Sequence, residues 1–331
     1  MLRRPLGRSG LSVSVPGLGC MGMSEFYGPA DDAQSRAALE AALALGYDFL
    51  DTADTYGLGH NETLIGSVLR EHREHRERIV VATKFGIVRE PGAYSRRIDN
   101  SPAYIAQACE ASLRRLGVET IDLYYCHRRD PALPIAEVVG AMARLVEAGK
   151  VRALGLSEVA PATLRAAHAI HPIAAVQSEY SLWSREPEQG LLAACRDLGV
   201  AFVAYSPLGR GFLTGHVDVA ALAPDDFRRS NPRFHGEALA RNRRLAEALG
   251  AFARERDASA AQVALAWLVA REPHVIPIPG ARRPDRLAEN AAAVDLPLSA
   301  DEIRDLDALF APDAVTGARY PEAGMVGIEP A

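Results

Sequence analysis

The chain has 331 residues, of which 48% are hydrophobic and 24% are charged, a composition typical of globular proteins with enough length for a large core. Its net charge of −5 and its sequence pI near 6.0 argue against nucleic acid or an anionic membrane as the main partner, because both need a basic surface. We therefore expect a small-molecule ligand.

The amino-terminal segment "MLRRPLGRSGLSVSVPGLG" has no apolar core of the kind found in signal peptides, and no stretch of the sequence is long and apolar enough to span a bilayer. These features favour a cytoplasmic protein. The histidines show no metal-ligand spacing, so we expect no metal. The four cysteines form no CxxC pair, so we expect reduced thiols at Cys20, Cys109, Cys126 and Cys195.

The stretch "LGRSGLSV" predicts a small β-hairpin within residues 1–15, which could plug one end of a barrel. Short apolar runs then recur, and each is followed by a loop and an amphipathic segment. The expected strands lie at 16–20, 47–52, 78–84, 121–127, 151–157, 173–179, 200–206 and 275–280.

Helix boundaries support this alternation of strands and helices. Ser101 reads as an N-cap before a proline, while Ser259 with Gln262 and Ser299 with Glu302 match the capping-box pattern. Glycines end several helical patterns just before the next strand, at positions Gly46, Gly117, Gly149 and Gly199.

Eight βα units without a linker predict the α/β class and a single (β/α)₈ TIM barrel domain over residues 1–331. A doubly wound sheet is the alternative, but it would usually carry G-x-G-x-x-G after its first strand, and "GLGCMGM" does not fit that spacing. Residues 207–236 form a long insertion after strand 7, where we expect a loop for cofactor or substrate. The C-terminal tail, 312–331, has little periodicity.

Lysine is rare in this chain. Of the 37 Lys and Arg residues, lysine occurs only at Lys84 and Lys150, so arginine serves as the ordinary surface cation. A position that keeps lysine is therefore a candidate for chemistry that needs a compact ammonium with an adjustable pKa. Lys150 sits in a helix-to-strand connection, whereas Lys84 ends an apolar strand.

Polar residues end the predicted strands, where the chemistry of a barrel is located. Asp51 ends strand 2, Tyr56 lies in its loop, Lys84 ends strand 3 and His127 follows strand 4. Because neighbouring strands are only ~5 Å apart, these side chains can meet in one pocket. We expect Lys84 to keep Asp51 charged and to lower the pKa of Tyr56 from ~10 towards neutrality, while His127 orients a substrate carbonyl oxygen.

Taken together, the motifs resemble those of the aldo-keto reductase superfamily, and most closely its microbial branch of NADPH-dependent reductases. The resemblance covers essentially residues 2–310, and the fragments that carry it read "FLDTADTYGLGHNETLIG", "VVATKFG", "IDLYYCH", "ALGLSE", "VAYSPLGRGFLTG" and "IPIPGARRPDRLAEN". The resemblance implies reduction of an aldehyde or ketone to an alcohol by hydride transfer from NADPH, giving NADP⁺. It implies a catalytic tetrad of Asp51, Tyr56, Lys84 and His127, with Tyr56 as general acid.

The resemblance also implies how the cofactor binds across the carboxyl face of the barrel. Ser157 and Gln177 would hold the nicotinamide carboxamide, and Tyr205 would stack on the ring. The nicotinamide border would be Gly19, Cys20 and Met21, and the pyrophosphate loop would be Ser206, Pro207, Leu208, Gly209, Arg210 and Gly211. The 2′-phosphate and adenine would be held by Gly280, Arg282, Arg286, Glu289 and Asn290. One departure concerns Glu158, which stands where many members have asparagine and cannot donate to the carboxamide oxygen.

Two other functions stay open beside the reductase. Some proteins of this fold resemble redox-sensing accessory subunits that bind NADP(H) and turn over slowly, and a barrel could also use Lys84 as a Schiff base. Substrate selection in such barrels comes from loops, here 20–30, 86–100, 128–133 and 207–236, with the tail. Candidate pocket walls suggest an apolar or aromatic carbonyl and are Phe26, Tyr27, Phe85, Trp183, Phe212 and Phe234. We expect a monomer or a weak homo-oligomer.

Overall fold

The computed structural model describes residues 1–90 and 96–330, and its central feature is a parallel sheet of eight strands. All the predicted strands are present, and sheet neighbours follow chain order. They are β3 (Leu18–Gly19), β4 (Phe49–Asp51), β5 (Val80–Phe85), β8 (Ile121–Cys126), β9 (Val151–Ser157), β10 (Ile173–Glu179), β11 (Ala201–Tyr205) and β12 (Val275–Pro277). The Gly17 amide donates to the Pro277 carbonyl (3.0 Å) and the Gly19 amide to the Pro279 carbonyl (3.3 Å), so the two edges join and the predicted barrel is confirmed.

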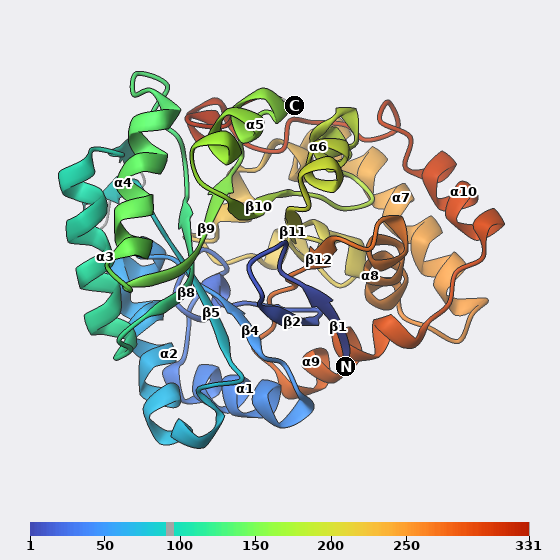
Figure 1. The fold of residues 1–331 in the computed structure, drawn as a ribbon. Helices are drawn as coiled ribbons and strands as arrows, with labels where there is room; N and C mark the ends of the chain where they lie inside the picture. The colour runs from blue at the N-terminus through green and yellow to red at the C-terminus, as the bar shows by residue number, and fades with distance from the viewer. Residues whose placement is uncertain (91–95, 331) are drawn as a thin grey trace.

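Helices surround the barrel (Figure 1). They are α1 (Asp32–Leu45), α2 (His60–Glu71), α3 (Pro102–Leu116), α4 (Ile135–Glu147), α5 (Pro161–Ile170), α6 (Leu191–Leu198), α7 (Gly236–Arg254), α8 (Ala260–Arg271), α9 (Pro284–Ala292) and α10 (Ala300–Leu309). Local signals fix several boundaries, since Ser101 caps α3 and Ser259 and Ser299 form the predicted capping boxes. Helix α1 ends at Gly46 with φ of 91°, a left-handed conformation that glycine adopts without steric cost.

The N-terminal hairpin closes the barrel at the amino-terminal ends of its strands. Its strands β1 (Leu2–Pro5) and β2 (Ser12–Val15) pair antiparallel, and in Figure 1 the hairpin lies across the middle of the barrel. Leu6, Leu11 and Val13 belong to one buried cluster with side chains from inside the barrel. The Ser14 amide donates to Asp48 (2.6 Å) just before β4, which ties the hairpin to this end.

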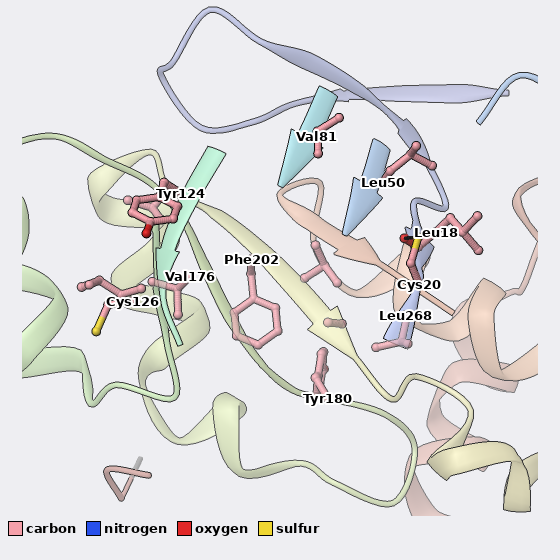
Figure 2. Close-up of a cluster of buried hydrophobic side chains, with 14 of the residues drawn as sticks. Leu18, Cys20, Leu50, Val81, Tyr124, Cys126, Val176, Tyr180, Phe202 and Leu268 are labelled. Carbon is pink, nitrogen blue, oxygen red and sulfur yellow. Dashed lines mark hydrogen bonds between the residues drawn. The ribbon is translucent and has the colours of Figure 1, made fainter. Parts of the chain in front are cut away.

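Alternation along each strand separates two apolar layers. Phe49 and Val80 belong to the cluster inside the barrel, whereas the next residues, Leu50 and Val81, belong to a larger cluster between the strands and the helices. Figure 2 shows members of this outer cluster, among them Leu50 and Val81 on adjacent strands. The same period of two places Asp51 on the interior side with Phe49.

Two segments are inserted between the strands and helices of the barrel. After β5, strand β6 (Ile87–Arg89) pairs antiparallel with β7 (Arg96–Ile98), where we expected only a loop over 86–100. Part of that loop, residues 91–95, lies outside the described residues. The insertion at 207–236 is confirmed and is built from short 3₁₀ helices, namely η5 (Gly209–Thr214), η6 (Val219–Ala221), η7 (Phe227–Ser230) and η8 (Pro232–Phe234).

The C-terminal tail folds back onto the connection after β9. Arg319 donates twice to the Glu158 carboxylate (3.1 and 2.6 Å), and the Glu329 amide donates to the Glu158 carbonyl (3.0 Å). The Glu329 carboxylate accepts hydrogen bonds from Arg129 (2.6 Å) and from the Ala160 amide (2.8 Å). Glu158 therefore anchors the tail at two points, through its side chain and its backbone.

We predict that Glu158→Gln loosens the tail. Burial by itself would raise the pKa of Glu158, but the charges of Arg319 and Arg128 and the hydrogen bonds from Arg319 and Tyr205 outweigh burial and hold the pKa below its usual 4.5. Removing the charge should speed amide exchange over residues 316–329 by roughly tenfold or more, because a buried ion pair that loses one partner is strongly destabilising. Hydrogen exchange read by mass spectrometry measures this.

The matched control is Glu322→Gln, which alters an exposed carboxylate of the same tail. Because the pKa of Glu158 is lowered in the folded state, its contribution should be complete above pH 4.5 and should disappear only as the pH falls through the lower folded value. Equal exchange rates in the two variants at neutral pH would contradict this role of Glu158.

Candidate active site

A cavity of about 1010 Å³ opens where the carboxyl ends of the strands meet the inserted loops. Its walls include the residues that end β4, β9 and β11, which are Asp51, Ser157 and Tyr205. His127, directly after β8, and Gln177, near the end of β10, also line it. The barrel thus brings together side chains that are far apart in the sequence.

Asp51 and Lys84 form a buried ion pair beneath this cavity. The Lys84 ammonium, with no exposed surface, contacts the Asp51 carboxylate and donates to the Thr52 carbonyl (2.7 Å). Gln177 donates to the other Asp51 oxygen (2.7 Å), so both carboxylate oxygens are used. Lys84 does not line the cavity itself, which argues against attack by its amine on a bound carbonyl compound.

Burial opposes both charges of this pair. It raises the pKa of Asp51 and lowers the pKa of Lys84, while the attraction and hydrogen bond between them resist both shifts. Each charge therefore depends on the other. The prediction that Lys84 supports the Asp51 charge agrees with this arrangement.

Tyr56 lies beside the ion pair and, like Asp51, lines the cavity. It begins the short helix η2 (Tyr56–Gly59), whose Gly57 and Leu58 have φ of 56° and 53°, so the chain turns sharply and holds the ring over β5. The Lys84 nitrogen lies 5.2 Å from the centre of the Tyr56 ring, and the His127 ring meets it edge-on with centres 5.8 Å apart. The Tyr56 hydroxyl makes no hydrogen bond to Lys84 in the part of the chain that the structure describes.

The expected lowering of the Tyr56 pKa is not found. Burial, and next the Asp51 charge, raise the pKa of Tyr56 well above 10, and Arg128 is the cation that opposes them. The physical reason is that Asp51 neutralises Lys84, so the ammonium has little net effect on the phenol. Tyr56 is therefore held in its protonated form.

Arg128 is a site residue that the sequence analysis did not name, although it begins the loop 128–133 that was expected to select the substrate. It follows His127, lines the cavity and is 4% exposed. One of its nitrogens donates to the His127 carbonyl (2.7 Å) and to the Ser157 hydroxyl (3.2 Å). Its position directly after a strand-end histidine was the available signal, but a chain so rich in arginine made that signal easy to discount.

Glu158 does not line the cavity. Its backbone has φ of 56°, and its carboxylate accepts hydrogen bonds from Arg319, from the Tyr205 hydroxyl (2.7 Å) and from the Glu179 amide (3.1 Å). Because these partners occupy the Glu158 carboxylate, this side chain stabilises contacts within the protein. Tyr205 also lies within 3.0 Å of the Tyr320 hydroxyl, which brings the tail to the cavity wall.

The loop after β11 lines the middle of the cavity through Ser206, Pro207, Leu208, Arg210 and Gly211. The Arg210 side chain turns inward, where it donates to Glu179 (2.7 Å) and lies over the Tyr320 ring, 4.3 Å from its centre. Arg210 thus joins the loop to the tail, an arrangement that the loop sequence did not suggest.

At the other end the cavity reaches the start of α9. Gly280, Arg282, Arg286, Glu289 and Asn290 all line it. Arg282 donates to the Pro29 carbonyl (2.7 Å) and the Tyr27 carbonyl (3.2 Å), and Arg286 donates to Glu289 (2.6 Å). Two guanidinium groups near a helix N-terminus make this end suitable for a phosphate.

Some expected wall residues lie elsewhere. Gly19 and Met21 line the cavity, whereas Cys20 is buried behind it and Gly209 packs against Trp183. Of the candidate aromatic walls, Phe26 and Tyr27 line the cavity. The others pack into the core, Phe85 on Tyr124 and three in one aromatic cluster, which is Trp183, Phe212 and Phe234.

Searches for other kinds of site give negative findings. Among residues 1–90 and 96–330, no group of three or more His, Cys, Asp or Glu side chains could hold a metal ion. No helix within the same ranges has the length and apolar character needed to cross a membrane. The four cysteines are buried free thiols, as predicted.

Comparison with known proteins connects this geometry to a family. The model of the aldo/keto reductase family matches residues 17–311. A probable aldo-keto reductase 1 from Glycine max is 42% identical over 316 residues, which cover 95% of this chain and 90% of that protein.

Solved structures show the same likeness. A glycerol dehydrogenase from Gluconobacter oxydans superposes with a TM-score of 0.83 at 30% identity, covering 94% of this chain and 96% of that one. A holo aldo-keto reductase from Bacillus halodurans gives 0.78 at 30% identity, covering 98% and 99%. A thermostable aldo-keto reductase bound to the inhibitor epalrestat gives 0.74 at 32% identity, covering 93% and 100%. Since the family match spans most of the barrel, as the strand-end motifs implied, this chain belongs to the aldo/keto reductase family of oxidoreductases.

Proposed function

We propose that the protein reduces an aldehyde or ketone to an alcohol with NADPH, using Tyr56 as the general acid. The observation that carries the proposal is the grouping of Tyr56 and His127 above the buried pair of Asp51 and Lys84 at one end of a long cavity. The family match supports an oxidoreductase of carbonyl compounds.

The residues present fit a phosphorylated nicotinamide cofactor. Arg282 and Arg286 offer guanidinium groups for a 2′-phosphate, and the loop from Ser206 to Gly211 lies between them and the catalytic end. Ser157 and Gln177 can hold the carboxamide, and Tyr205 offers a flat face for the ring. When bound, NADPH supplies the hydride that reduces the carbonyl carbon.

Tyr56 supplies the proton. Because burial and Asp51 keep its pKa high, the phenol is protonated at neutral pH and ready to act as an acid. An alkoxide forming on the carbonyl oxygen is a far stronger base than a phenolate, since even bulk water has a pKa of ~15.7. Tyr56 can therefore pass its proton to that oxygen as the alkoxide forms.

The neighbouring side chains position the reacting groups and offset the charges that arise during this proton transfer. His127 lies beside Tyr56 and can donate to the carbonyl oxygen. Arg128 stabilises the phenolate that remains after transfer, and the Lys84 ammonium, 5.2 Å from the centre of the ring, offsets the Asp51 charge that opposes this phenolate. Asp51 fixes Lys84 in place, and Gln177 in turn fixes Asp51.

The same electrostatics set how the rate of each direction of the reaction depends on pH. Alcohol oxidation needs Tyr56 to start as a phenolate, which the raised pKa makes scarce at neutral pH. The rate of carbonyl reduction should therefore be maintained at neutral pH, whereas the rate of alcohol oxidation should rise only at alkaline pH. Within residues 1–90 and 96–330, no structural feature specifically favours the sensor function. The cytoplasmic location, the absence of a metal and the monomeric or weakly oligomeric state stay predictions from the sequence.

The direct test is loss of absorbance at 340 nm when NADPH and 4-nitrobenzaldehyde or other carbonyl compounds are added. Replacing the acid, Tyr56→Phe, should lower kcat by about 10²- to 10⁴-fold, the usual contribution of a general acid. Affinity for NADPH, measured by tryptophan fluorescence, should change little because the hydroxyl serves only the proton transfer. Turnover retained in this variant would refute the mechanism, and NADPH binding without turnover in the wild type would favour a sensor.

The two lysines offer a matched pair of variants. Lys84→Arg should lower kcat/KM at least about tenfold, because the longer, planar guanidinium cannot reproduce the contacts with Asp51 and the Thr52 carbonyl. Lys150→Arg, which changes a surface partner of Glu110, should leave kcat/KM unchanged. Thermal melting of both variants separates loss of activity from loss of fold, and near-normal activity of a folded Lys84→Arg protein would exclude the role given to Lys84.

Cofactor preference tests the phosphate end of the cavity. Arg286→Ala should raise the Kd for NADPH by roughly 10- to 100-fold, the range for one hydrogen-bonded ion contact, and leave the Kd for NADH nearly unchanged. The control is Arg304→Ala, which removes an exposed arginine side chain on α10. An equal rise in the Kd for NADPH and in the Kd for NADH would show that Arg286 does not contact the 2′-phosphate.

A further inference from the structure

Buried positive charge exceeds buried negative charge next to the catalytic end of the cavity. Two carboxylates lie there, Glu158 and Glu179, each with 3% or less of its side chain exposed. Four guanidinium groups accompany them, each at most 9% exposed, from Arg128, Arg210, Arg233 and Arg319. Since Asp51 and Lys84 balance each other, the excess belongs to this group.

The two carboxylates are already taken by three of these arginines. Glu158 receives both hydrogen bonds of Arg319, and Glu179 pairs with Arg210 at 2.7 Å and with Arg233 at 3.8 Å. Arg128 forms no ion pair within residues 1–90 and 96–330. Two positive charges are therefore in excess: one is shared by Arg210 and Arg233, which both pair with Glu179, and the other is on Arg128, which Glu158 reaches only beyond ion-pair distance.

Arg128 also has hydrogen-bonding capacity to spare. A guanidinium carries five N–H donors, and the described structure uses only one terminal nitrogen, on the His127 carbonyl and the Ser157 hydroxyl. Its Nε is buried without a partner among the described residues. A buried cation with unused donors is costly unless an anion meets it, so the side chain points to a ligand in the cavity that it lines.

The cofactor does not supply this anion under the proposed function. Its phosphates belong with Arg282, Arg286 and the loop after β11, while Arg128 adjoins Ser157 and His127 at the catalytic end. The nicotinamide ring carries no negative charge. The anion must then come with the molecule whose carbonyl is reduced.

We propose that Arg128 binds a carboxylate of the substrate, so that the enzyme prefers aldehydes or ketones that are also carboxylic acids. This inference rests on the proposed function and narrows its substrate class. The hydrogen bonds to the His127 carbonyl and to Ser157 hold the guanidinium in a fixed position, which suits a two-point contact with a carboxylate. Phe26, Tyr27 and Ile87 line the same cavity and suit an apolar or aromatic body between the two polar groups.

The test compares each acid with its own amide, which has nearly the same shape and no charge. The pairs are phenylglyoxylate, 3-formylbenzoate and 4-formylbenzoate with the corresponding carboxamides, so that several spacings between carbonyl and carboxylate are sampled. For at least one pair, kcat/KM should favour the acid by about tenfold or more, as for a hydrogen bond between charged groups. Arg128→Gln should remove this preference for the acid. Arg152→Gln, which changes an arginine at the outer surface beside Asp122, should keep the preference.

A binding measurement keeps the inference testable without turnover. With NADPH present, calorimetry should show benzoate binding more tightly than benzamide to the wild type, with the difference lost in Arg128→Gln and partly kept in Arg128→Lys. Thermal melting confirms that the variants are folded, and the lysine variant serves if glutamine prevents folding. Turnover of the amides with no acid preference and no benzoate binding would overturn the inference and leave the reductase standing. Benzoate binding that depends on Arg128, without turnover of any carbonyl compound, would support the anion site and reject the proposed function.

Discussion

The ion pair of Asp51 and Lys84 is the constraint on which the catalytic end of the barrel depends. Neither charge could stay inside the barrel by itself, because burial opposes both. Each is satisfied by the other and by one further group, the Gln177 amide on the carboxylate and the Thr52 carbonyl on the ammonium. The pair can form because β4 and β5 are adjacent and parallel, with Asp51 opposite Ala82 in register. Two residues further along β5, the alternation of side chains brings Lys84 to the same interior side.

Electrostatics around Tyr56 come from more than this pair. Because Lys84 is neutralised by Asp51, the phenol remains a weak acid, protonated until a stronger base forms beside it. Arg128 is the cation that counteracts the raised pKa of Tyr56, and it also donates a hydrogen bond to the Ser157 hydroxyl. One arginine thus links the proton donor, the expected carboxamide contact and the space for substrate. Glu158 and Arg319 keep the tail at the edge of the same region, where Tyr320 meets Tyr205.

The architecture could be predicted from sequence because its signals are local. Each strand is a short apolar run, each helix has an amphipathic pattern, and caps such as Ser259 and Gly46 act within one turn of the residue that bears them. The β6 and β7 hairpin was missed because its strands are only three residues each and lie in a polar context. Phe85, Trp183, Phe212 and Phe234 were assigned to the cavity, yet they pack in the core. An aromatic residue at a strand end or in a connecting loop can face the cavity or the core, and only packing decides which.

The sequence by itself determined the order of strands and helices and the placement of Asp51, Lys84 and His127 at strand ends, and the motifs identified the family. Periodicity and strand ends are properties of a few consecutive residues. Only the tertiary structure decided which arginines are buried and which of them lack a counter-charge. Arginines at the surface and in the interior look alike in a chain where nearly all cations are arginine. The tertiary structure also decided the role of Glu158, since its partner Arg319 lies 161 residues away, and the protonation of Tyr56, because burial and net charge arise only when distant segments pack together.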